Sequence, residues 1–154
     1  MKNVICFKSK IGNIFIAEEN KKITNISFSK ISGICNKTEI LKLAKTQITE
    51  YLQGTRKTFD FPIKFNGTEF QKKVWNELLK IPYGQTASYK EIATKIGNKN
   101  SFRAVGNANN KNNLLIFVPC HRIIKTDGTL GGYAGTIEIK KKLLDLESKN
   151  LFTK

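Results

Sequence analysis

The chain has 154 residues, enough for one domain with a substantial core or for two small domains. Its composition, 40% hydrophobic and 25% charged, is ordinary for a globular protein, and it contains no apolar run long enough to cross a membrane. The N-terminus also lacks the long apolar core of a signal peptide, so we expect a cytoplasmic protein.

The charge balance is the first informative feature. Lys and Arg number 27 against 12 Asp and Glu, which gives a formal net charge of +15. An excess of this size attracts polyanions and favours nucleic acid as a partner. A genome with a biased composition would produce the same excess of Lys and Asn, so charge alone does not decide between the two explanations.

The cysteines and the single histidine limit the metal chemistry. Cys6, Cys35 and Cys120 are too few for a disulfide framework and suit a reducing compartment. His121 is the only histidine, and no pair of cysteines has CxxC spacing. We therefore expect no metal site, and we interpret Cys6 and Cys35 as packed thiols.

The first part of the chain, residues 1–62, is expected to form a small α/β domain with antiparallel strands. Alternating apolar residues predict strands, and apolar residues at helical spacing followed by Gly54 predict a helix and its end. The predicted elements are strands at 4–9, 13–17 and 22–29 and a helix at 37–52.

The second part, residues 63–154, is expected to be mostly helical. An extended connector over 59–67 leads to Thr68, which can cap a helix that ends at Ile81-Pro-Tyr-Gly. Ser88 can then cap a short helix, with Glu91 completing a capping box, and Ser101 can cap the next helix. Two short helices joined by a turn with Gly97 have the organisation of a helix-turn-helix.

The second of these helices carries residues suited to DNA. Ala104 and Gly106 permit close approach to a groove, while Arg103 can contact phosphates or bases. The amides Asn107, Asn109 and Asn110 could do the same. The alternative is an ordinary helical hairpin with a solvated basic face.

A reactive cysteine is predicted after the apolar run Leu114–Val118, which we interpret as a buried strand. Pro119 would end this strand and place Cys120 at the mouth of the core. His121 and Arg122 supply a base and a positive charge, which would lower the pKa of the thiol. Glu147, in a last helical pattern, could orient His121. The alternative for Cys120 is a buried structural thiol.

From Phe70 to Glu147 the chain resembles the O6-alkylguanine-DNA alkyltransferases, also called methylated-DNA–protein-cysteine methyltransferases. The N-terminal part fits the small, variable α/β domain of that family, which is RNase H-like, and the C-terminal part its winged-helix-like helix-turn-helix. The matching stretches are Phe70-Gln71, Val74-Trp75, Ile81-Pro-Tyr-Gly84, Ser88-Tyr89, Ile92-Ala93, Arg103-Ala-Val-Gly106, Pro119-Cys-His-Arg-Ile-Ile124, Gly131-Gly-Tyr-Ala-Gly135, Lys140, Leu143-Leu144 and Glu147.

The resemblance implies direct reversal of DNA damage, in which Cys120 takes the alkyl group from guanine O6 and each molecule acts once. His121 would act through water as the base, with Glu147 orienting it. Tyr89 would help protonate the departing guanine and rotate its phosphate, and Asn112 would hold the turn around Cys120. No cofactor is implied, because the damaged base is itself the donor.

The resemblance also implies how double-stranded DNA is bound. Arg103 would intercalate where the flipped nucleotide was, with the helix-turn-helix in the minor groove. The remaining residues expected at the substrate or the DNA are Ser88, Ala104, Gly106, Asn110, Arg122, Ile123, Tyr133, Ala134 and Gly135. A monomer is expected; activity on O4-alkylthymine and cooperative binding along DNA stay open.

Three residues depart from the family pattern: Asn113 for a usual proline, Thr136 for a common glycine, and Phe102 at a position near the DNA that is often small. Two other functions are weighed against repair. A regulator or non-catalytic damage-binding protein would use the helix-turn-helix without Cys120. A Cys–His hydrolase would need an oxyanion hole and would leave the basic charge unexplained.

Overall fold

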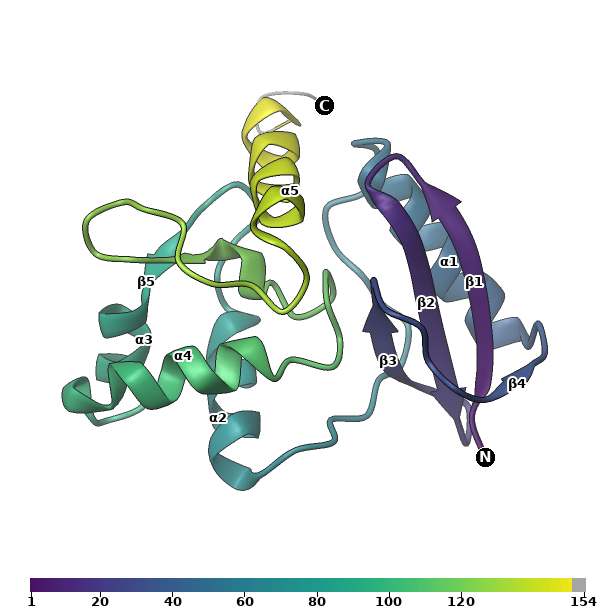
Figure 1. Cartoon of the computed structure of the whole chain (residues 1–154), viewed down its shortest axis with the longest axis horizontal. Helices are drawn as coiled ribbons and strands as arrows, with labels where there is room; N and C mark the ends of the chain where they lie inside the picture. The colour runs from purple at the N-terminus through teal and green to yellow at the C-terminus, as the bar shows by residue number, and fades with distance from the viewer. Residues whose placement is uncertain (151–154) are drawn as a thin grey trace. The chain divides into compact units, whose positions relative to one another are not determined.

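Strands dominate the first part of the chain and helices the second, as Figure 1 shows for the computed structural model. The structure describes residues 1–150. Its contacts separate two units, Met1–Asn66 and Gly67–Lys154. The α+β fold class predicted from the sequence, with an antiparallel sheet in the first part and helices in the second, is confirmed. No helix in the described part of the chain is both long and apolar enough to span a bilayer.

The N-terminal unit is built on a four-stranded sheet with the strand order β3-β2-β1-β4. The three predicted strands are present and pair antiparallel as β1 (Asn3–Ser9), β2 (Gly12–Glu19) and β3 (Lys22–Ser27). The short β4 (Ile34–Cys35) pairs parallel with β1 and was not predicted, because two exposed residues carry no alternation.

The predicted helix is α1 (Glu39–Leu52), which contacts β1, β2 and β3. Thr38 caps its first turn, and Gly54 adopts a φ of 81° just after its end, as a glycine at this position can. Ile14, Ile16 and Ile48 are completely buried in the core of this unit. The prediction that Cys6 and Cys35 are packed thiols is wrong, since both are exposed on their strands.

The C-terminal unit contains four α-helices within the described residues: α2 (Glu69–Leu78), α3 (Tyr89–Lys95), α4 (Phe102–Asn110) and α5 (Ile137–Asn150). Two-residue strands β5 (Ala87–Ser88) and β6 (Ile123–Ile124) pair in parallel. Trp75 is buried, and its indole Nε1 donates to the carbonyl of Ala108 over 2.9 Å, which fastens α2 to α4.

Capping residues fix where α2 and α3 begin along the chain. Thr68 and Ser88 each form a capping box, with Gln71 and Glu91 at the third helical position. The prediction that Ser101 caps α4 is wrong. Residues Lys99–Ser101 form a 3-10 turn, and the Ser101 hydroxyl donates to the Asn98 carbonyl over 2.6 Å. Asn98 takes the capping position of that turn instead.

The strand predicted over Leu114–Val118 is also wrong. These residues form a buried turn in which the Val118 amide donates to the Leu114 carbonyl over 2.9 Å and Ile116 has a φ of 75°. The apolar run was correctly interpreted as core, since Leu114, Leu115, Ile116 and Val118 are buried. Its short length could not distinguish a strand from another buried conformation.

Candidate active site

Cys120 begins a 3-10 turn, Cys120–Arg122, directly after Pro119. Asn112 fixes this turn: its Nδ2 atom donates to the Val118 carbonyl over 3.0 Å and to Cys120 Sγ over 3.2 Å. The Leu114 amide in turn donates to Asn112 Oδ1 over 2.9 Å. The thiol is fully buried, so the expectation that Cys120 lies at the mouth of the core is wrong.

The surroundings of Cys120 keep the resting thiol neutral. Burial raises its pKa to about 12, although the hydrogen bond from Asn112 and the charge of Lys140 act in the opposite direction. The prediction of a lowered pKa is therefore wrong for the resting protein. A neutral thiol is a weak nucleophile, so its proton has to be removed as it reacts.

His121 and Glu147 form a buried pair with 2.7 Å between Nε2 and Oε2. Burial lowers the pKa of His121, so the imidazole stays neutral. Burial by itself would raise the pKa of Glu147, but hydrogen bonds from His121 and Arg122 hold it well below its ordinary value. The ionised carboxylate can only accept, so the imidazole carries its proton on Nε2 and Nδ1 is its basic nitrogen.

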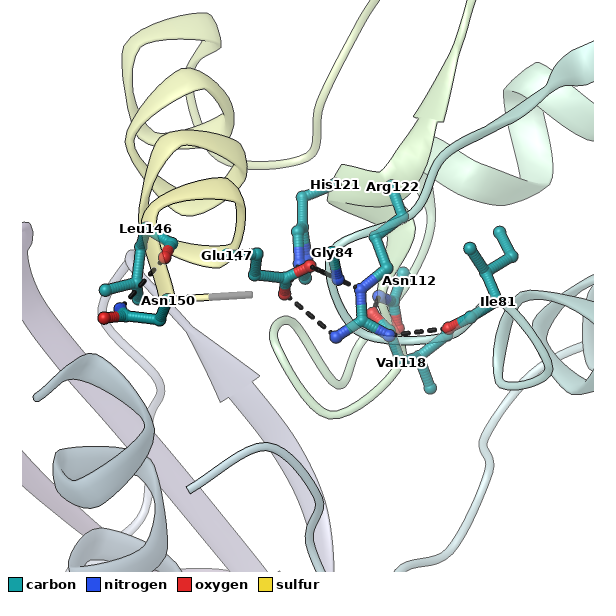
Figure 2. A network of polar contacts seen from close by, with 9 residues as sticks. All are labelled: Ile81, Gly84, Asn112, Val118, His121, Arg122, Leu146, Glu147 and Asn150. Carbon is teal, nitrogen blue, oxygen red and sulfur yellow. Dashed lines mark hydrogen bonds and ion pairs between the residues drawn. The ribbon is translucent and has the colours of Figure 1, made fainter. Parts of the chain in front are cut away.

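Arg122 completes this network, which Figure 2 shows from close by. Its guanidinium donates to both carboxylate oxygens of Glu147, over 2.8 and 2.9 Å, and to the Ile81 carbonyl over 2.7 Å. The Gly84 amide also donates to Glu147, over 3.2 Å. The expectation that Arg122 contacts substrate or DNA does not fit this geometry, because its side chain is buried and turned inward.

Lys140 matches the family pattern, but no role was assigned to it from the sequence. A lysine in an amphipathic helix usually reaches solvent, but this one is fully buried. Its Nζ donates to the carbonyls of Leu130 and Gly132, the latter over 3.0 Å. Burial lowers its pKa to about 8, and the negative charge that Cys120 can carry acts in the opposite direction.

Tyr89 and the segment that follows Leu130 pack closely together. Gly131 has a φ of 71°, and a Cβ atom there would lie 2.7 Å from the Tyr89 hydroxyl, so only glycine fits. Burial raises the pKa of Tyr89, while a hydrogen bond with the Gly132 backbone lowers it. Tyr133 is buried beside Cys120, and among residues 1–150 its hydroxyl has no hydrogen-bond partner.

The helix α4 presents the residues that the sequence assigned to DNA on one exposed side. Arg103, Ala104, Asn107 and Asn110 are exposed, whereas Val105, Ala108 and Asn109 face the core. The expectation that Asn109 contacts DNA is therefore wrong. Ser88 is buried and used as the cap of α3, and Ile123 is buried in β6. Ala134 is exposed and Gly135 partly so.

Sequence comparison relates both units to one kind of protein. A family model described as the DNA-binding domain of 6-O-methylguanine DNA methyltransferase matches residues 69–149. A second, described as the ribonuclease-like domain of 6-O-methylguanine DNA methyltransferase, matches residues 4–65. The chain belongs to the O6-methylguanine-DNA methyltransferase family.

Relatives in this family match nearly the whole chain. A methylated-DNA–protein-cysteine methyltransferase of Methanosarcina barkeri is 43% identical over 152 residues, covering 94% of this chain and 96% of its own. The constitutive methyltransferase of Bacillus subtilis is 43% identical over 151 residues, covering 91% and 92%. Among solved structures, the Mycobacterium tuberculosis O6-methylguanine methyltransferase has a TM-score of 0.91 at 36% identity and covers 100% of this chain and 97% of that one.

Membership in the methyltransferase family decides against the hydrolase considered from the sequence. The structure forms two buried pairs, Asn112–Cys120 and His121–Glu147, on adjacent residues of the turn after Pro119, with Lys140 and Tyr89 close to Cys120. Tyr89 comes from α3, Lys140 and Glu147 come from α5, Asn112 follows the end of α4, and the others lie in the turn after Pro119. Of the residues expected at the site, Arg122 acts inside the network, and Arg103 lies apart on the surface of α4.

Proposed function

We propose that this protein repairs DNA by moving an alkyl group from O6 of guanine to the sulfur of Cys120. The observation that carries the assignment to Cys120 is its hydrogen bond with Asn112 next to the His121–Glu147 pair. Relatives at 43% identity over more than 90% of the chain are named methylated-DNA–protein-cysteine methyltransferases. Cys35 and Cys6 are exposed strand residues with no such surroundings.

The proposed transfer forms the bond between Cys120 Sγ and the alkyl carbon, and breaks the bond between that carbon and guanine O6. The thiol proton passes through water to Nδ1 of His121, whose Nε2–H is held by Glu147. The guanine leaves with the electron pair and takes a proton from the Tyr89 hydroxyl. The product is a thioether, which none of these groups can hydrolyse, so each molecule acts once.

We propose that the protein binds DNA as a monomer. The exposed side of α4 would lie against the minor groove. Small Ala104 permits close approach, and Arg103 is free to enter the space of an extruded nucleotide. The net charge of +15 favours a polyanionic partner. A Mycobacterium tuberculosis relative solved in complex with DNA has a TM-score of 0.90 at 38% identity. The extruded base would meet Tyr133, Ala134, Gly135 and Ile123.

The test is mass spectrometry of the full chain after mixing with a duplex that contains O6-methylguanine. We expect one added methyl per molecule, on the Cys120 peptide, saturating when protein and lesion are equimolar. A protein that binds the duplex but stays unmodified would instead be a damage-binding protein.

The variant Cys120→Ser is expected to lose methyl transfer completely while keeping its affinity for the duplex, because it changes one buried atom and none on α4. The measurement is the same mass spectrum together with a binding titration. Cys6→Ser is the matched control and should transfer like the wild type. Methyl uptake by the Cys120→Ser variant would show that Cys120 is not the acceptor.

A further inference from the structure

Two cysteines lie on one face of the N-terminal sheet, and the transfer chemistry proposed above does not use them. Cys6 is on β1 and Cys35 on β4, and both are exposed. The strands β1 and β4 are neighbours and run parallel, with Val4 opposite Cys35. Paired residues point to the same face of a sheet, and so do residues two apart in one strand. Cys6, two residues after Val4, therefore shares a face with Cys35.

This face is open to solvent at both cysteines. Phe7, the neighbour of Cys6, points the other way, toward α1, where the Lys45 ammonium lies 5.4 Å from the centre of its ring. The segment between β3 and β4 crosses the sheet on the side of Cys6 (Figure 1), and a Cβ atom on Gly33 would lie 2.5 Å from Val4 Cγ2. The crossing segment buries Val4 but leaves both thiols accessible.

The spacing of the two thiols suits a bridging ion better than a disulfide. Neighbouring strands lie about 4.8 Å apart and rise about 3.3 Å per residue, so the Cα atoms of Cys6 and Cys35 are about 8 Å apart. A disulfide usually requires Cα atoms within about 6.8 Å. Two sulfurs on opposite sides of one ion, with metal–sulfur bonds of about 2.3 Å, lie about 4.6 Å apart, and cysteine side chains can span that arrangement from this distance.

The small number of ligands selects the kind of ion. Residues 1–150 contain no group of three or more His, Cys, Asp or Glu that could hold a metal ion, so the four-ligand set of a structural zinc is not present there. Thiolates select soft cations such as Cu(I), which two thiolates satisfy in a linear arrangement. That complex is negatively charged. Lys8, exposed on β1 two residues after Cys6 and on the same face, offsets the charge.

We propose that Cys6 and Cys35 form a two-coordinate site for Cu(I), which we call the Cys6–Cys35 site. Two sulfur–copper bonds form, the two thiol protons leave to water, and no electron is transferred. The bound ion ties the two-residue strand β4 to β1 at the edge of the sheet. The site does not depend on the repair function, because Cys120 is fully buried in the other unit.

The experiment titrates the full-length protein with Cu(I) in the absence of oxygen, in competition with the chelator bicinchoninate. We expect one ion per molecule. Cys6→Ser and Cys35→Ser should each weaken binding more than about 100-fold, since even the loss of a group that only supports a metal ligand costs up to that much. Cys120→Ser, which removes the buried thiol, is the matched control and should bind like the wild type. Wild-type affinity in either exposed-cysteine variant, or lost binding in Cys120→Ser, would overturn the site.

The pH dependence separates binding by two thiols from adventitious binding by one. Below the ordinary pKa of a thiol, about 8.5, each proton released on binding makes the affinity rise about tenfold per pH unit. The wild type should therefore gain about 100-fold between pH 6 and pH 7, and each serine variant only about tenfold. A gain of about tenfold in the wild type would mean that one thiol suffices, and would overturn the pairing.

The copper site and the repair function fail independently. Cys6→Ser and Cys35→Ser should take up methyl from the O6-methylguanine duplex like the wild type, because neither touches Cys120. A wild-type protein that binds one Cu(I) with the expected pH dependence but takes no methyl would overturn only the repair function. Normal methyl transfer with no copper bound above the competition of the chelator would overturn only the Cys6–Cys35 site.

Discussion

At the scale of the single residue, the buried thiol of Cys120 is a weak nucleophile because its pKa is raised, and its reactivity depends on its neighbours. Burial holds its thiol protonated, and two groups act against that effect: Asn112 through a hydrogen bond and Lys140 through charge. In the proposed transfer, His121 is the base that takes the proton. A buried, protonated thiol is protected from oxidation and from metal binding. This protection matters because a thiol that is oxidised or metal-bound could no longer accept the alkyl group. Its neighbours therefore decide when the proton is lost.

The variant Glu147→Gln tests the base. It keeps the shape of the side chain but removes the charge that orients His121 and pairs with Arg122. We expect single-turnover transfer to slow at least about 10- to 100-fold, the loss seen when the carboxylate that orients a metal-bound histidine is removed. The assay should be run where circular dichroism shows both proteins folded. The exposed Glu138→Gln, on the same helix, serves as the control. An unchanged transfer rate would exclude Glu147 from the network.

Lys140→Met tests the buried charge. With its pKa lowered to about 8, Lys140 is charged at pH 7 and loses that charge as the pH rises through 8. We expect the variant to react about tenfold more slowly than the wild type at pH 7, the effect of one pKa unit on the thiol. The difference should shrink at pH 9, where the wild type has also lost the charge.

The measurement for Lys140→Met is the pH profile of the reaction with free O6-benzylguanine. Lys142→Met, two residues further along α5 and exposed, is the matched control. A gap that is the same at pH 7 and pH 9 would mean that Lys140 only braces the Leu130 and Gly132 carbonyls.

At the scale of the element, α3 positions Tyr89, and α4 links an exposed surface to the turn around Cys120. The short α3 is held at its start by the Ser88 capping box, which places Tyr89 against Gly131. The helix α4 carries a buried side that ends near Asn112 and an exposed side that begins with Arg103. One helix thereby connects the surface proposed for DNA with the turn that holds Cys120.

Arg103→Ala tests the exposed side of α4. Extruding a base from the stack costs a few kcal/mol, so loss of the intercalating side chain should slow repair of duplex DNA by at least about tenfold. Reaction with free O6-benzylguanine, which needs no extrusion, should be affected much less. The assay compares single-turnover rates on the two substrates, with Lys111→Ala, at the other end of α4, as the control. Equal losses on both substrates would argue against intercalation.

The buried network links stability to pH at the scale of the whole molecule. The pKa of His121 is lowered from 6.5 and that of Glu147 from 4.5, so the unfolded chain binds protons more readily than the folded one at both groups. The stability that these two groups contribute should therefore be constant above about pH 6.5, fall as His121 protonates on unfolding, and fall again below about pH 4.5.

Urea unfolding at pH 8, 5.5 and 4 checks this pH dependence. Trp75 is the only tryptophan and is buried in the C-terminal unit, so its fluorescence reports on the unit that holds the network. Glu147→Gln should lose the second decrease and keep the first. A wild-type midpoint that does not change with pH would contradict the assigned pKa directions.

The sequence by itself determined what depends on near neighbours. The strands β1, β2 and β3, the helix α1 and the caps at Thr68 and Ser88 were predictable, because alternation, helical spacing and capping boxes act within a few residues. The Pro-Cys-His-Arg stretch predicted a reactive cysteine with a structural thiol as the alternative, and the resemblance to the alkyltransferases, carried by several short motifs, implied that Cys120 is the acceptor.

Only the tertiary structure decided what depends on distant contacts. The pairs Arg122–Glu147 and His121–Glu147 join residues 25 and 26 positions apart, and Lys140 is buried although its helix is rich in lysine. Burial also reversed the expected direction of the Cys120 pKa and turned the apolar run Leu114–Val118 into a buried turn. The physical reason is that desolvation and charge pairing are set by the groups that surround a side chain, which local pattern does not specify.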